Sequence, residues 1–361
     1  MKKVLPAVFL IVGTLIGAGF ASGREISVFF ARFGVYSLFF LPILFILFYY
    51  VFKLLLSIGK DREFDNIYKL HAFTKNSVFM NALICLAFII FTSAMLSAGV
   101  ELLSSNFVSV PSAVFYIIIL LLSFLVLKFG FKGLVKINAV LVPLLICTII
   151  TLCVFATFNP VTDAVFVPES TKVYELPISM LLYAMGNILL SYYIIVKSGS
   201  GLDEKRIRRV SLISSLIICI VIFISIVCLI KNGSAIMEAD MPFVALSYRM
   251  GEVFNIFFIF MVLMAVLTTL FSGLFTSYEA LPFKKHKKLF TLFLVFAMSL
   301  VGFKQIVNYI YPIIGIIGIV VIIRLAFSYR SFLKPSFNSG NYEIHTPGKQ
   351  TENERCRHNK V

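Results

Sequence analysis

Residues 13–23 read GTLIGAGFASG and place four glycines and a serine inside an otherwise apolar stretch. Each interior glycine weakens a helix by roughly 0.5–1 kcal/mol relative to alanine, so this spacing predicts an interruption at Gly17 and Gly19. A helix broken inside a bilayer exposes N–H groups at one end and C=O groups at the other. The N–H groups favour a carboxylate and the carbonyls favour a cation, a pair of charges that a zwitterionic amino acid carries. Close helix packing is the alternative, because these glycines also form GxxxG pairs.

Ionisable residues beside the apolar stretches are few. Arg24 and Glu25 follow the predicted interruption, and Glu101 stands near the end of the third stretch. Carboxylates inside a membrane mark ion and proton pathways, so Glu25 and Glu101 are candidates for gating or proton coupling. Glu25 could close an outer gate by pairing with an arginine. Solvated charge at the membrane surface is an equally good interpretation.

The composition determines the class of protein to which these residues belong. Of 361 residues, 60% are hydrophobic and 14% charged, with a mean hydropathy of +0.99. This is the composition of a polytopic membrane protein, whose first partner is the lipid bilayer. The net charge of +15 comes from basic residues in short loops, so no nucleic-acid partner is expected. No HExxH, CxxC, Ser/His pair or paired intramembrane Asp is present, so we expect neither an enzyme nor a resident cofactor. The sequence does not specify an oligomeric state.

Runs of about 20 apolar residues predict ten transmembrane helices. Most lysines and arginines then fall in alternate loops, which places both termini in the cytoplasm of a multi-pass plasma-membrane protein. The basic start and small residues of the first span also resemble a secretory signal peptide. The polar segment 329–361 is expected to be a disordered cytoplasmic tail after a transporter domain at 1–328. The predicted spans are about 4–22, 35–57, 78–103, 110–127, 134–158, 176–196, 209–230, 252–277, 289–303 and 306–327.

The ten spans divide into two halves with matching layout, about 4–158 and 176–328. A loop of similar length separates the second and third spans of each half, and the third spans are the longest. Because five is odd, the second half must lie inverted relative to the first, a plan that secondary transporters use to build a midplane site from discontinuous helices. The sixth span should therefore also be interrupted, and it carries Gly186 and Asn187 at its centre.

We expect a small-molecule substrate to bind between the two interruptions. Ser93 and Ser97 of the third span are spaced i, i+4 and share a face that could line the same cavity, although membrane serines as often hydrogen-bond between helices. The expected substrate-binding residues are Gly17, Ala18, Gly19, Phe20, Ser93, Ser97, Tyr183, Gly186 and Asn187.

The stretch GTLIGAGFASGREI, followed by FFARFG, resembles the amino-terminal signature of the YkvI-like bacterial membrane proteins. That family is placed in the amino acid/polyamine/organocation superfamily. The resemblance implies an all-α, LeuT-like 5+5 inverted-repeat fold in which helices 1 and 6 are discontinuous.

The superfamily resemblance also implies a sodium site between the first and eighth helices. Its ligands would be the carbonyls of Gly13, Ile16 and Ala265 and the hydroxyls of Thr268 and Thr269. The last three are spaced i, i+3, i+4 and share a helical face, and uncharged oxygens suit this hard cation. The alternative is that both hydroxyls bond back to carbonyls of their own helix.

The leading hypothesis is a secondary active transporter that moves an amino acid or related solute by alternating access coupled to sodium. A proton-coupled transporter is one alternative. A receptor-like or complex-forming subunit that binds a small molecule without net transport is the other.

Overall fold

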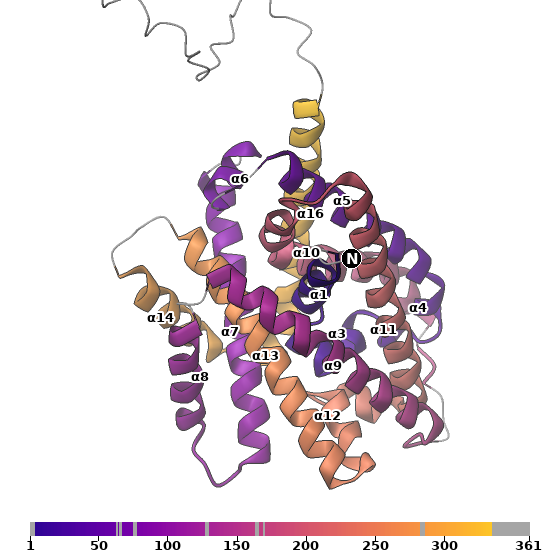
Figure 1. Cartoon of the computed structure of the whole chain (residues 1–361). Helices are drawn as coiled ribbons and strands as arrows, with labels where there is room; N and C mark the ends of the chain where they lie inside the picture. Colours follow the sequence, from indigo (N-terminus) through magenta and orange to yellow (C-terminus); the bar gives the residue numbers. More distant parts are fainter. Residues whose placement is uncertain are drawn as a thin grey trace, which may run out of the picture.

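A computed structural model describes residues 4–62, 64, 67–74, 78–126, 130–162, 166–168, 170–281 and 286–333. These residues form helices and connecting segments without a strand. Seven of the described helices are long and apolar enough to cross a membrane, and α1 and α8 are shorter apolar helices. The protein is therefore a polytopic, all-helical membrane protein, with its helices gathered into one bundle (Figure 1).

Each of the ten predicted spans contains a long or apolar helix. These helices are α1 (Val4–Leu15), α5 (Leu41–Asp61), α7 (Val78–Asn106), α8 (Ser112–Val126), α9 (Gly130–Phe158), α10 (Leu176–Gly199), α11 (Glu204–Glu238), α13 (Glu252–Ala280), α14 (Lys287–Ser299) and α16 (Tyr311–Leu333). Shorter segments connect them: α2 (Ala18–Ala21), α3 (Arg24–Phe29), η1 (Ala31–Phe33), α4 (Tyr36–Phe39), α6 (Ile67–Phe73), η2 (Ser170–Glu175), α12 (Pro242–Ser247), η3 (Tyr248–Met250), α15 (Phe303–Gln305) and the π-helix η4 (Ile306–Ile310).

The predicted interruption of the first span is confirmed at Gly17, whereas Gly19 lies within the short helix α2. Helix α1 ends at Leu15, and Gly17 is extended, with φ −87° and ψ −163°, before α2 begins. A second bend at Gly23, whose φ is +82°, separates α2 from α3. Because a left-handed φ costs a non-glycine residue about 1–2 kcal/mol, the glycine fits this bend. Helix α1 lies inside the bundle, packed against α9, α10, α11 and α13 (Figure 1).

The predicted interruption of the sixth span is wrong, because α10 is continuous through Gly186 and Asn187. The Asn187 amide donates to the carbonyl of Tyr183, four residues earlier, at 3.2 Å and so stays within the helix. Gly186 instead allows close packing, since a Cβ there would lie 3.2 Å from the ring of Tyr311.

Small residues on α16 bring it against the same helix. A Cβ at Gly315 would lie 2.5 Å from the carbonyl oxygen of Leu182, and one at Gly318 would overlap the carbonyl of Met185. The two backbones therefore approach more closely than larger side chains would allow, as small-residue stripes permit in membrane helices. This packing holds Tyr311 next to the centre of α10.

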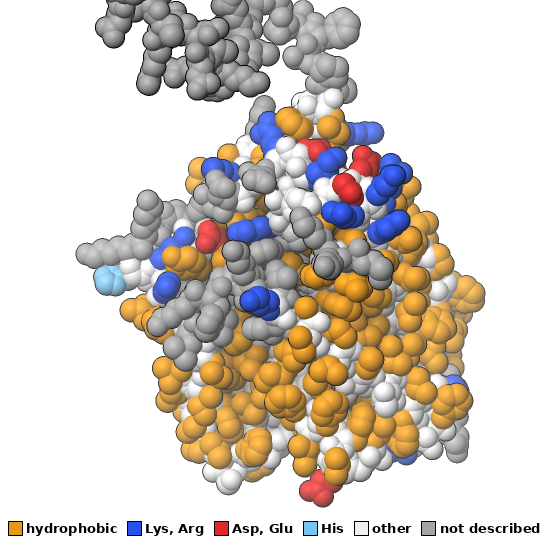
Figure 2. Space-filling model, viewed as in Figure 1, with side chains coloured by type: hydrophobic (Ala, Val, Ile, Leu, Met, Phe, Trp, Pro, Cys, Tyr) orange, Lys and Arg blue, Asp and Glu red, His pale blue; other side chains and the backbone are white. Residues whose placement is uncertain are grey.

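Charged side chains gather at one end of the bundle, and the faces below them are largely hydrophobic (Figure 2). The charged end joins the end of α5, the start of α11 and the end of α16. There Tyr329 donates to Asp61 at 2.5 Å, and Arg208 pairs with Glu204 at 3.0 Å. Helix α16 continues to Leu333, past the expected start of the tail at 329. The remainder of that predicted tail lies outside the described residues.

Candidate functional site

The interruption of the first span leaves backbone groups without helical partners. Among the described residues, no hydrogen bond reaches the carbonyls of Gly13, Leu15 and Ile16 or starts from the amides of Gly17 and Ala18. All five residues are buried. An unpaired backbone group in a membrane interior costs several kcal/mol, so a ligand that carries both donors and acceptors would stabilise this segment.

Two of these carbonyl-bearing residues line a small cavity. Its volume is about 10 Å³, and its lining includes Gly13, Ile16, Ala265 and Thr268, together with apolar side chains of α9 and α13. Such a volume is about the least that holds one water molecule or a small ion. Four of the five residues expected at the sodium site therefore meet at one cavity.

The hydroxyls of Thr268 and Thr269, the two threonines expected to bind sodium, donate hydrogen bonds within their own helix. Thr269 donates to the carbonyl of Ala265 at 2.9 Å and Thr268 donates to the same oxygen at 3.0 Å. These are the back-bonds of the alternative interpretation, yet a donating hydroxyl keeps acceptor lone pairs for a cation. Thr269 also touches the interruption, because a Cβ at Gly17 would lie 2.8 Å from its Oγ1.

Glu25 lies inside the protein, not at its surface. Its side chain is 2% exposed, and its Oε2 makes no hydrogen bond. The carboxyl folds back over the interruption, so that a Cβ at Gly19 would overlap Oε1 and lie 2.6 Å from Cδ. Asn187 and Tyr311 approach the carboxyl from α10 and α16. The interpretation of Glu25 as solvated interfacial charge is therefore wrong.

Tyr183 and Tyr311 lie near this carboxyl and pack against phenylalanine rings. Phe29, on α3, lies 5.8 Å from the ring of Tyr183 and 5.6 Å from that of Tyr311, measured between centroids. Phe30 packs edge-on against Tyr183 at 4.9 Å, and Phe91 lies 6.1 Å from Tyr311. The Tyr311 hydroxyl makes no hydrogen bond. We call Phe29, Phe91, Tyr183 and Tyr311 the aromatic cluster.

Arg24 points away from Glu25. Its guanidinium donates to the carbonyls at the end of α11, the closest being that of Ala239 at 3.1 Å, and to Oδ1 of Asn308 at 3.0 Å. It also lines a cavity of about 500 Å³ that lies between α3, α11 and the segment before α16. The expected ion pair between Glu25 and an arginine is not formed among the described residues.

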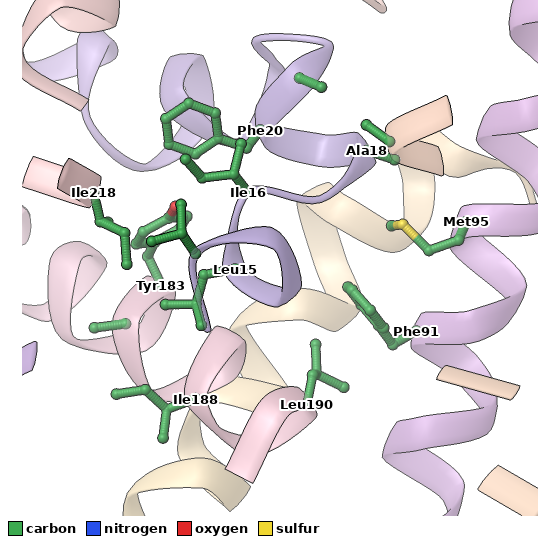
Figure 3. Close-up of a cluster of buried hydrophobic side chains, with 14 of the residues drawn as sticks. Leu15, Ile16, Ala18, Phe20, Phe91, Met95, Tyr183, Ile188, Leu190 and Ile218 are labelled. Atoms are coloured by element: carbon green, nitrogen blue, oxygen red, sulfur yellow. The ribbon is translucent and has the colours of Figure 1, made fainter. Parts of the chain in front are cut away.

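Helix α7 presents a different face to the interruption than expected. Figure 3 shows Phe91 and Met95 extending from α7 toward the segment that carries Ala18. Ser93 follows Phe91 by two residues and Ser97 follows Met95 by two, which places the serines on nearly the opposite side of the helix. Ser93 donates to the carbonyl of its own i−4 residue at 2.7 Å. Phe91 and Met95 therefore point from α7 toward the interruption, and a role of Ser93 and Ser97 in substrate binding stays a prediction.

The other expected binding residues are buried, but not all of them face the interruption. Gly17, Ala18, Gly19 and Phe20 lie at the interruption, and Tyr183 and Asn187 on α10 lie near the Glu25 carboxyl. Gly186 instead faces Tyr311 and Gly315 of α16. Figure 3 shows Phe20 and Tyr183 on the same side of α1. Glu101 lies elsewhere, half-buried on α7 near Asp240 and Lys304. Sequence reasoning missed Phe91, Met95 and Tyr311, which have no motif to distinguish them in a chain with 39 phenylalanines and 15 tyrosines.

Comparison with known proteins gives one relative and a shared fold. No protein-family model matches the chain. It is 25% identical over 323 residues to the uncharacterized membrane protein YkvI of Bacillus subtilis (strain 168), a match that covers 84% of this chain and 90% of that protein. Crystal structures of a manganese transporter from Eremococcus coleocola are similar in fold. A mutant of that transporter gives a TM-score of 0.53 at 13% identity over 91% of this chain and 76% of the other. Its complex with an aromatic bis-isothiourea substituted compound gives 0.51 at 14% identity with the same coverage.

Proposed function

We propose that this protein is a secondary active transporter that moves an amino acid or a related small solute by alternating access coupled to sodium. The observation that carries the proposal is the cavity lined by Gly13, Ile16, Ala265 and Thr268. It lies beside an interrupted helix whose buried carbonyls have no partners, so oxygen ligands from two helices converge on a space of ionic size. The fold shared with a solved transporter supports the same class of function.

The topology that we propose is ten crossing helices in two inverted halves of five, as in LeuT-like transporters, with both termini in the cytoplasm. The charged end formed by α5, α11 and α16 supports this orientation, because basic residues concentrate on the cytoplasmic side of membrane proteins. In this arrangement α1 with α2 and α3 forms the one discontinuous helix of the site, and the continuous α10 faces it. The asymmetry makes the first span the principal ligand-binding element.

Manganese, the cargo named for the structural relative, fits this site poorly. Among the described residues, no group of three or more His, Cys, Asp or Glu side chains is placed to hold a metal ion. The interruption offers one carboxylate, backbone amides and carbonyls, and aromatic rings. Such a mixture of donors, acceptors and apolar surface suits a small organic solute.

The test is solute uptake by proteoliposomes under an imposed sodium gradient, with Thr268→Ala and Thr268→Ser as a matched pair. Removal of one oxygen ligand should weaken sodium affinity tenfold or more, equivalent to about 1.4 kcal/mol or more. The serine variant retains the hydroxyl and should retain the sodium dependence. Uptake that ignores the sodium gradient would overturn the coupling, and solute binding without accumulation would favour a receptor-like subunit.

A further inference from the structure

We infer that Glu25 recognises the ammonium group of the solute, so that the transporter accepts amine-bearing solutes and rejects their deaminated counterparts. This inference rests on the proposed function and names the chemical class of its substrate. It also implies that the carboxyl releases a proton when the amine binds.

Geometry supplies the first argument. The Glu25 carboxyl lies over Gly19, in the segment whose backbone groups have no partners, and one of its oxygens makes no hydrogen bond although the side chain is 2% exposed. A carboxyl that served only to hold α3 in place would be expected to use both oxygens on protein donors. The Asn187 amide and the Tyr311 hydroxyl lie close enough to interact with the carboxyl, but neither makes a hydrogen bond of ordinary geometry to Oε2, so this oxygen can accept one from a ligand.

The surroundings of the carboxyl supply the second argument. The groups that face it are Asn187 and Tyr183 from α10 and Tyr311 from α16, none of them cationic. From α11, Cys219 lies beside Tyr183. Arg24 faces Glu238 and Asp240 on the other side of α3. Among the described residues, Glu25 therefore has no positive partner of its own.

A buried carboxylate without a cation is too costly to persist, so without a bound amine the carboxyl carries a proton. An ammonium ion can replace that proton. The O–H bond of the carboxyl breaks, the proton leaves to solvent, and the ammonium keeps its three hydrogens and pairs with the carboxylate. Tyr183 and Tyr311 lie near the carboxyl, and aromatic rings beside a carboxylate can add to the attraction for an ammonium ion, as they do in aromatic cages.

The charge of the site disfavours a solute that has a carboxylate and no amine. Such a solute would place a second negative charge beside an ionised Glu25, and against the protonated carboxyl it gains no ion pair. The carboxylate of a zwitterion has a separate place at the free amides of Gly17 and Ala18. An amine is therefore required and a carboxylate is tolerated.

The experiment measures thermal shifts of the purified full chain with three matched series: amino acids, their decarboxylated amines and their deaminated acids. In the wild type, at least one amino acid and its amine should stabilise the protein, and the corresponding acid should not. Binding should release about one proton, measured by calorimetry in buffers of different ionisation enthalpy. Glu25→Gln should lose the amine response at least tenfold and release no proton.

Glu252→Gln, at the exposed start of α13, removes the same charge outside the site and should behave as the wild type. Stabilisation by sodium alone reports whether Glu25→Gln is folded. A panel in which no amine-bearing compound stabilises the wild type, or in which acids act as strongly as amines, would overturn the inference. Sodium-driven transport of such acids would leave the proposed function intact, whereas loss of sodium dependence would remove that function and not this inference.

Discussion

Gly19→Ala tests the position of Glu25 without touching its charge. The added Cβ would overlap Oε1 of Glu25 and lie 2.6 Å from Cδ and 2.7 Å from Cγ. Ordinary carbon contacts are about 3.5–4.0 Å, so the carboxyl must withdraw by about 1 Å or more. Because the clashing atoms are the far end of a flexible side chain, it can do so by changing rotamer.

The expected effects on folding and on binding differ in size. Alanine in place of glycine favours the helix by up to about 1 kcal/mol, which offsets the cost of moving the side chain, so stability should change by about 1 kcal/mol or less. Amine binding should suffer far more. Separating the partners of a buried ion pair costs about 3–5 kcal/mol, which corresponds to a loss of affinity of about 100-fold or more.

Affinity is measured by calorimetry with the amine-bearing compound that most stabilises the wild type, and stability by thermal unfolding without solute. Gly99→Ala is the control, because it adds the same methyl group on α7, 3.1 Å from the side chains of Ile119 and Val266. That variant should bind the amine normally. If Gly19→Ala bound the amine as tightly as the wild type, the placement of Glu25 over the interruption would not matter for recognition and the reasoning would fail.

Two further predictions concern contacts outside the binding site. His71 on α6 bonds to Tyr192 on α10 at 2.5 Å, and burial lowers the pKa of His71 to about 4 from its ordinary 6.5. Between these pH values the unfolded chain therefore binds more protons than the folded chain. Acidification from pH 6.5 towards 4 should reduce the free energy of unfolding by up to about 3 kcal/mol. In denaturation series at several pH values, His71→Gln should flatten this pH dependence. Arg24→Lys keeps the charge, but a lysine cannot contact the carbonyl of Ala239 and the side chain of Asn308 together. Thermal unfolding should therefore show a free energy of unfolding lower by about 1–3 kcal/mol. An unchanged midpoint would mean that this contact does not hold α3 to α11.

The positions of the helices followed from the sequence because they depend on local composition. Apolar runs set the spans, and glycines at 17 and 23 produced the bends at which α1, α2 and α3 separate. The expected break in α10 failed because one Gly-Asn pair does not decide between a bend and a close contact. That choice depends on Tyr311 and Gly315, more than a hundred residues away, which pack against the helix.

The candidate site was predictable from the sequence where its residues form a motif. It was not predictable where residues from distant parts of the chain come together only in the fold. The i, i+3, i+4 spacing of Ala265, Thr268 and Thr269 indicated their common face, and the cavity adjoins that face. The rotation of α7 in the bundle decides which of its sides faces the interruption. The pair of serines in the sequence does not indicate this rotation. Glu25 was visible as a rare charge, but its burial follows from the fold of α3 over Gly19.

Net charge in the loaded site determines when sodium is needed. Glu25 as a carboxylate, a zwitterionic amino acid and one sodium ion together carry no net charge, whereas the zwitterion without sodium leaves one negative charge buried, which is costly. Sodium should therefore raise the affinity for a zwitterionic amino acid by a coupling of about 1–3 kcal/mol. A monocationic amine neutralises Glu25 by itself, so its affinity should gain little from sodium. Calorimetric titrations of an amino acid and its decarboxylated amine, each with sodium or choline as the salt cation, measure this difference; equal sodium effects on both would show that Glu25 does not set the charge balance of the site.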